Sequence, residues 1–229
     1  MKQSIYGKKL LWAVTLNFFL LSIYSCNDKD DIGYLWNKTL SNHSNSSASK
    51  SIPLTQSGKP GTDFMFVREM ERYLSLNNLY SERTDSFELR VWYNLLEDST
   101  QLFVVKYGDE GWHSELTKFS VSRESIKDSF RIEKTSKQTM PARDWNSFLH
   151  AMINYNILDL PDQDSLRGYE LATEGSVMTF EVASKNFYRM YSYATPKLNM
   201  TKFNEVKTAM SFVDFLNIEF NLSLPSTVF

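Results

Sequence analysis

Few residues in this 229-residue chain could do chemistry, and their spacing limits what that chemistry could be. The chain has one cysteine, Cys26, and three histidines, His43, His113 and His150. The histidines lie far apart, and no HxxxH, HxH or Cys–His spacing would bring two metal ligands together. We therefore expect isolated surface histidines, with His150 on the water-facing side of a helix, and no metal site or cofactor.

Nucleophilic catalysis needs a serine or cysteine beside a positioned base, and the chain has neither a GxSxG nor an SxxK motif. His113 has carboxylates close in sequence at Asp109, Glu110 and Glu115. One of them could orient the imidazole, although the same residues also suit an ordinary polar hairpin end. No catalytic residue is predicted.

The densest acidic set is Asp159, Asp162 and Asp164 in the stretch LDLPDQDSL. Paired carboxyl groups could serve a glycosidase, and the Asp-x-Asp spacing could contribute ligands to Ca²⁺. The stretch lacks the glycine and the distant glutamate of a calcium-binding EF-hand loop. We expect a solvated acidic turn, with a hydrolase kept as an alternative.

Aromatic residues are abundant, at 14% of the chain. Trp92, Trp112, Arg189 and Tyr191 fall on predicted strands, and tryptophan, tyrosine and arginine dominate the binding energy of many interfaces. These four residues form our candidate binding surface. The alternative is that the aromatic rings pack in the core between a sheet and its helices.

The N-terminus has the layout of a secretory signal. Lys2, Lys8 and Lys9 precede a mostly apolar run at residues 10–24, and an acidic cluster follows. The run is shorter than the roughly 20 residues that a membrane-spanning helix needs. Removal of the segment is therefore the favoured interpretation.

Ile23, Tyr24, Ser25 and Cys26 resemble the lipobox of a bacterial lipoprotein precursor. The resemblance covers residues 1–31 and includes the sequence NDKDD, which resembles the export tag of surface lipoproteins in Bacteroidota. It implies that residues 1–25 are cleaved and that Cys26 carries a thioether-linked diacylglycerol, with a further acyl chain such as palmitate on its amino group. Two or more chains would hold the protein firmly in the outer membrane of the cell envelope, where surface exposure is one expectation.

Composition limits the remaining function classes. The net charge is −2 and no basic patch stands out, so nucleic acid is not an expected partner. Residues 26–62 are rich in Ser, Asn and Asp and are predicted to form a flexible tether. Residues 63–229 are predicted to form a single globular domain, which has no second cysteine for a disulfide.

Periodicity predicts the elements of this domain. Helices are expected to start at residue 64, at Pro141 and near Thr201. Strands are expected at 87–93, 101–107, 112–121, 129–134, 168–173, 177–183 and 187–193. The order predicts an α+β fold, with an antiparallel sheet in two hairpin or meander blocks and about three helices packed on one face.

The sequence thus predicts a lipid-anchored envelope protein that presents a non-enzymatic binding domain for a protein, peptide or glycan. The alternatives are a hydrolase with an unrecognised acidic or histidine-based site, and a structural subunit of an envelope complex. A polar cleft joining two carboxylates, or His113 and a hydroxyl, would favour the hydrolase. An exposed aromatic face without a cleft would favour binding, and an extended apolar face would favour assembly.

Overall fold

The computed structural model describes residues 50–54, 58–82, 84, 87–94, 99–124, 129–172 and 175–224. All of them belong to one compact unit, Ser46–Phe229. The signal segment, Cys26 and most of the predicted tether lie outside the described residues. Strand β1 (Lys50–Ser51) belongs to the sheet, so the folded unit starts earlier than the predicted boundary at residue 63. None of the described helices is long and apolar enough to span a membrane.

The domain is built on a seven-stranded mixed sheet with the strand order β1-β7-β6-β2-β3-β4-β5. The strands after β1 are β2 (Phe87–Tyr93), β3 (Thr100–Gly108), β4 (Gly111–Glu124), β5 (Ser129–Thr139), β6 (Val177–Ser184) and β7 (Phe187–Ala194). Only the short β1–β7 pair is parallel. The meander β2–β5 and the hairpin β6–β7 are the two predicted blocks, and they meet where β2 pairs with β6.

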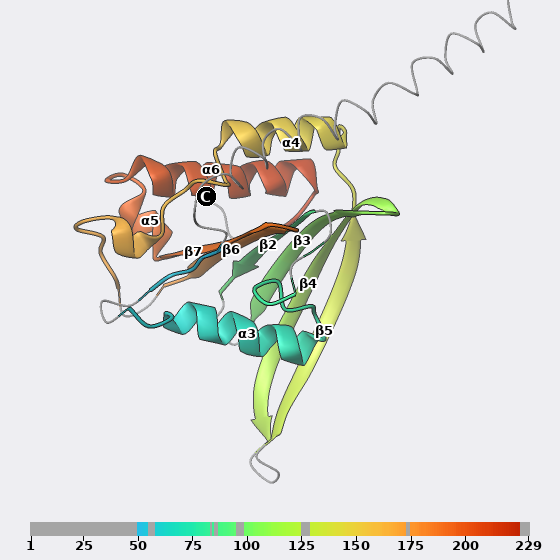
Figure 1. Ribbon diagram of the computed structural model, residues 1–229, viewed down its shortest axis with the longest axis horizontal. Coiled ribbons are helices and arrows are strands. Elements are labelled where there is room, and N and C mark those ends of the chain that lie inside the picture. Colours follow the sequence, from blue (N-terminus) through green and yellow to red (C-terminus); the bar gives the residue numbers. More distant parts are fainter. Residues whose placement is uncertain are drawn as a thin grey trace, which may run out of the picture. The chain divides into compact units, whose positions relative to one another are not determined.

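The α+β fold class is confirmed, but the helices lie on both faces of the sheet rather than on one (Figure 1). Helix α3 (Thr62–Leu74) covers one face, and α4 (Trp145–Asn154) and α6 (Asn204–Glu219) cover the other. The short α5 (Pro196–Asn199) precedes α6. The central strands are therefore buried on both sides, and every residue of β6 is buried.

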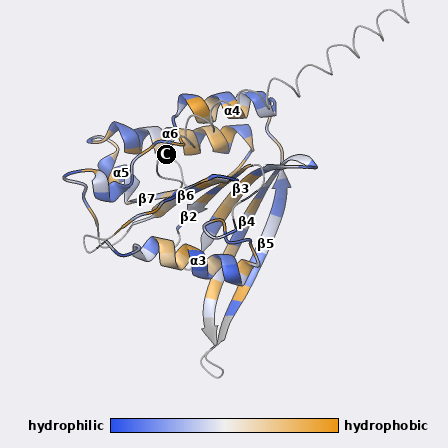
Figure 2. Cartoon of the chain, viewed as in Figure 1, coloured by the Kyte–Doolittle hydropathy of each residue, from blue (hydrophilic) through white to orange (hydrophobic). Residues whose placement is uncertain are grey.

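Helices α3, α4 and α6 each bury an apolar side against the core (Figure 2). On the α3 face, Val67 and Met70 pack with Trp92 in one cluster of buried residues. On the other face, the rings of Phe103 and Phe220 lie 5.0 Å apart between centroids. The molecule thus has two apolar layers, one on each side of the sheet.

Three predicted boundaries need correction. Residues 168–172 form no strand, because the Asn199 side chain accepts a hydrogen bond from Glu170 N and donates one to Glu170 O. Helix α4 starts after Pro141, at Trp145, where the Asp144 carboxylate accepts a hydrogen bond from Ser147 N at 2.6 Å. The last helix starts at Asn204, three residues after the predicted cap at Thr201.

Candidate functional site

Helix α3 leaves part of its face of the sheet uncovered, and a groove lies there over β2–β5. Two adjoining hollows of about 320 and 810 Å³ share the residues Asn77, Glu88, Lys106 and His113. The helix ends here because Ser75 adopts the left-handed conformation, with φ 58°. We call this region the sheet groove and define it by Asn77, Glu88, Lys106, His113, Glu115 and Ser136.

Strand alternation places the polar side chains in the groove. Alternate residues of a strand point to the same face, so His113, Glu115 and Thr117 of β4 project together. Lys106 of β3 lies opposite His113, and Ser136 of β5 lies opposite Thr117. Three neighbouring strands therefore contribute to one polar surface.

Glu115 lies at the centre of this surface. Its Oε1 accepts a hydrogen bond from Thr117 Oγ1 at 3.0 Å, and Thr117 Oγ1 is 2.8 Å from Ser136 Oγ. His113 Nε2 lies 3.9 Å from Glu115 Oε2. The hydrogen bond from Ser136, aided by that of Thr117, holds the pKa of Glu115 below its usual value. The groove therefore contains a fixed, ionised carboxylate.

This arrangement differs from a nucleophile relay. In such a relay a base accepts the proton of a hydroxyl, and a carboxylate orients that base. Here the carboxylate itself contacts both the hydroxyl groups and the imidazole. Glu115 therefore holds the two hydroxyl groups and the imidazole in place around it.

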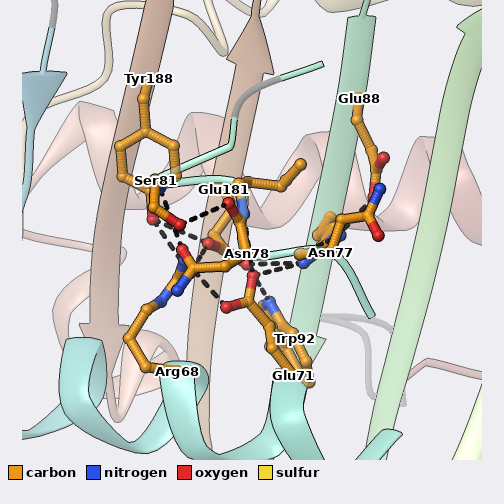
Figure 3. A network of polar contacts seen from close by, with 11 residues as sticks. Arg68, Glu71, Asn77, Asn78, Ser81, Glu88, Trp92, Glu181 and Tyr188 are labelled. Atoms are coloured by element: carbon orange, nitrogen blue, oxygen red, sulfur yellow. Dashed lines mark hydrogen bonds and ion pairs between the residues drawn. The ribbon is translucent and has the colours of Figure 1, made fainter. Parts of the chain in front are cut away.

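A second polar feature lies next to the groove, between α3 and the sheet (Figure 3). We call it the buried charge cluster, made of Arg68, Glu71, Glu88, Arg90 and Glu181. Arg90 is only 1% exposed. Its Nη1 donates to Glu71 Oε1 at 2.5 Å and its Nε donates to Glu88 Oε1 at 2.6 Å.

Glu181 of β6 anchors the other side of the cluster. It accepts hydrogen bonds from Arg68, from Trp92 Nε1 at 2.8 Å and from Tyr188 Oη at 2.7 Å. Figure 3 shows Arg68 and Glu71 reaching up from α3 toward this carboxylate. The oxygens of Glu181 are thus hydrogen-bonded although the side chain is fully buried.

The cluster contains three carboxyl groups but only two guanidinium groups. Burial, and then the charge of Glu181, raise the pKa of Glu71 to about 8. Glu71 is therefore mostly protonated at neutral pH, and the two remaining carboxylates balance Arg68 and Arg90. Because Arg90 and Glu88 also line the groove, the cluster holds one wall of the groove in place.

The four predicted binding residues do not come together as one exposed surface. Trp92 and Tyr191 are both 0% exposed, with Trp92 on the α3 face and the Tyr191 hydroxyl bonded to Ile157 O on the other side. Trp112 is half-buried and stacks on Trp145, with 5.2 Å between ring centroids. The physical reason is that both faces of the sheet are covered by helices, so strand aromatics become core residues.

Arg189, like Trp112, is partly exposed. Its Nη2 donates a hydrogen bond to the backbone oxygen of Leu160 at 2.5 Å. This bond fastens the loop that follows α4 to strand β7. Cys26, the predicted lipidation site, lies outside the described residues.

The acidic loop is more ordered than a solvated turn. Asp162 Oδ2 accepts a hydrogen bond from Ser192 N, and Gln163 Oε1 accepts one from Ala194 N, so both side chains bond to the edge of β7. Burial raises the pKa of Asp162 to about 6. In the described part of the chain, no three His, Cys, Asp or Glu side chains are grouped so that they could hold a metal ion.

His150 is exposed, as the helical pattern predicts. The sheet groove itself is the site that the sequence interpretation missed. Its signal was the polar, period-two face of β4 at His113, Glu115 and Thr117. That signal could be used only once the position of α3 was known.

Comparison with known proteins gives no family model and no curated protein that matches this chain.

Proposed function

We propose that the chain is a lipid-anchored cell-envelope protein whose domain binds a peptide segment of a partner protein in the sheet groove. The observation that supports this most is that the polar groups of the groove are fixed internally. Glu115 is held by Thr117 and Ser136, and Glu88 is held by Arg90. A preorganised site loses less conformational entropy when a ligand binds.

The lining favours a peptide over a glycan. Among the described residues, four aliphatic side chains and no Phe, Tyr or Trp ring line the first hollow; the four are Leu74, Leu76, Leu102 and Val104. Sugar rings usually pack their C–H faces on aromatic rings. Tyr107 and Trp112 line the second hollow, but their rings pack against each other, with 5.0 Å between centroids, and Trp112 is also stacked on Trp145. Aliphatic side chains of a peptide are therefore the better match for the groove.

Hydrolysis is less well supported than binding. A glycosidase needs one carboxyl group with a raised pKa as its general acid. The pKa of Glu115 is shifted in the opposite direction. The ionised Glu115 of the groove is thus suited to accept hydrogen bonds from a ligand rather than to protonate one.

Filling the groove is expected to abolish peptide binding. The whole chain, purified in detergent, would be used to select binders from a displayed library of short random peptides. A Ser136→Trp change should weaken the selected peptides by at least about tenfold, because it occupies the space they need. Lys137→Trp is the matched control, since its side chain is on the same strand but lines a different hollow.

Two results would contradict the proposal. One is that the selected peptides bind the Ser136→Trp variant as well as the wild type. The other is that no peptide is enriched from the library.

The proposed lipid anchor at Cys26 is tested separately. Cells expressing the chain and fed an alkyne-labelled palmitate are expected to label it, and Cys26→Ser should abolish that labelling because the thioether cannot form. Ser25→Ala keeps a small residue before the cleavage position and should leave labelling intact. Undiminished labelling of the Cys26→Ser variant would refute the anchor.

A further inference from the structure

We infer that the partner peptide binds as an extended strand, which pairs with the open edge of β5 and extends the sheet beyond its seven strands. This inference rests on the proposed peptide-binding function and specifies how its ligand is recognised, namely through backbone N–H and C=O groups. It follows from a difference between the two edges of the sheet.

The edge at β7 is closed. The strand β1, only two residues long, pairs in parallel with the start of β7. Further along β7, the side chain of Asp162 accepts a hydrogen bond from Ser192 N at 2.8 Å, and that of Gln163 accepts one from Ala194 N at 2.6 Å. A very short edge strand and a covering loop are two ways in which proteins prevent pairing with a further strand.

The edge at β5 differs in both respects. This strand is 11 residues long and, in the part of the chain that the structure describes, it is hydrogen-bonded to β4 and to no second strand (Figure 1). In an antiparallel pair, every second residue directs its N–H and C=O groups away from the partner strand. All side chains from Glu133 to Gln138 are exposed as well. β5 therefore presents a row of backbone donors and acceptors to a further strand.

The open edge borders the sheet groove. Lys134, Ser136 and Gln138 of β5 line its two hollows. Neighbouring strands lie about 4.8 Å apart, so alternate side chains of an added strand would stand directly beside these three residues. Ser136 is the smallest of them, and a long side chain placed opposite it can extend over β5 into the first hollow. One extended segment can thus pair with the edge and fill the groove.

The charges of β5 favour a different chain over a second copy as the added strand. Arg131, Lys134 and Lys137 are exposed, whereas Glu133, whose Oε1 lies 3.1 Å from Arg131 Nη2, is the one acidic residue of the sequence between 129 and 139. Pairing two copies along β5 would bring these basic side chains together, and like charges on paired strands are destabilising. Basic side chains on an edge strand prevent such self-pairing. The added strand therefore comes from a partner protein.

The test uses the peptides enriched from the displayed library, resynthesised with a fluorescein label, and the whole chain in non-ionic detergent. Each backbone N–H of a peptide is methylated in turn, which removes one donor and leaves the side chains unchanged. Methylation should weaken binding at least about tenfold at every second position, where the N–H points to β5, and less than about threefold at the positions between. Fluorescence anisotropy measures each affinity.

Hydrogen exchange locates the bound strand. Peptide binding should slow the exchange of the outward backbone amides in residues 129–139 at least about tenfold, because they gain hydrogen-bond partners. The amides of β7 should exchange as before, since that edge is already closed. Ser136→Trp should abolish this protection together with peptide binding, whereas the control Lys137→Trp should retain both.

The outcomes separate this inference from the proposed function. Binding that Ser136→Trp blocks, but that shows neither alternation on methylation nor protection of 129–139, would overturn strand pairing and leave peptide binding in the groove. Failure to enrich any peptide would overturn both. Slow exchange of all amides in 129–139 before any peptide is added would show that the edge is already covered. The cover would be a second copy if dilution removes the protection and another segment of this chain if it does not, and either result overturns the inference.

Discussion

Replacing Arg90 with methionine is expected to lower the free energy of unfolding by about 3–5 kcal/mol. The guanidinium contacts Glu71, Glu88 and the backbone oxygen of Asn77, and it is 1% exposed. Methionine fills much of its volume but leaves the surrounding oxygens without their donor. Removing one partner of a buried ion pair costs far more than the net value of the pair, because the other charge stays buried.

Arg72→Met provides the matched control on the facing helix. Arg72 is 73% exposed and lies 3.8 Å from Glu69, so its loss should cost less than about 0.5 kcal/mol. Urea unfolding of the whole chain at pH 7, followed by tryptophan fluorescence, measures both changes. An equal, small effect of the two substitutions would show that the buried charge cluster does not stabilise the fold.

Two further variants keep this test decisive if Arg90→Met does not fold. Arg90→Lys keeps one positive charge but loses the planar fork, so its stability should lie between wild type and Arg90→Met. Adding Glu88→Gln to Arg90→Met removes one stranded carboxylate and should recover part of the loss. A double variant no more stable than Arg90→Met alone would contradict the role given to Glu88.

The ion pairs of Arg90 show what a sequence pattern can and cannot predict. The alternation at Glu88, Arg90 and Trp92 predicts strand β2 and places these side chains on one face. Because about three helices were expected on one face of the sheet, the opposite face would have been left without a helix. Glu71 and Glu181 are the missing partners, and they come from α3 and β6, far away in the sequence. A local pattern cannot predict such pairings.

The candidate binding residues show the same limit in another form. Trp92 and Tyr191 belong to residue types that are common both at interfaces and in cores. Composition and strand position do not separate these cases, whereas a helix covering each face of the sheet does. The predicted strand at 168–173 is wrong for a related reason. The side chain of Asn199, distant in sequence, hydrogen-bonds the backbone N–H and C=O groups of Glu170.

The sheet groove was not predicted, although part of its polar lining can be recognised in the sequence. The carboxylates near His113 were interpreted as a polar hairpin end, and the polar alternation of His113, Glu115 and Thr117 along β4 was not used. The hollow itself depends on where α3 stops, and Ser75 sets that point by adopting a left-handed conformation. Serine at a helix end has no strong preference for this conformation, so sequence reasoning could not place the groove.

The stability of the domain is expected to fall as pH rises from about 6 to 8, because Glu71 keeps its proton in the fold but is ionised in the unfolded chain, so that unfolding releases a proton. Its pKa is about 8 in the folded chain, against an ordinary value of 4.5. Between these values the folded state holds one more proton than the unfolded state. The stabilisation is thus complete below pH 4.5 and is lost as pH rises through 8, by at most about 1.4 kcal/mol per pH unit.

Glu71→Gln is expected to remove this dependence. Glutamine resembles the protonated acid and keeps an oxygen for Arg90 Nη1 and Leu79 N. The charges facing it stay in place, namely Arg68 on α3, Arg90 on β2 and Glu181 on β6. Urea unfolding at several pH values should therefore give a flatter stability profile between 6 and 8 for this variant than for the wild type.

Two control variants identify the source of the slope. Glu69→Gln changes an exposed carboxylate on the same helix and should leave the slope between pH 6 and 8 as in the wild type. Asp162→Asn should flatten the profile only below about pH 6, since the pKa of Asp162 is raised to about 6. If Glu71→Gln and the wild type keep the same slope above pH 6, Glu71 is already ionised in the fold. The buried charge cluster would then carry a net negative charge, and its stability would depend on Arg90 still more strongly.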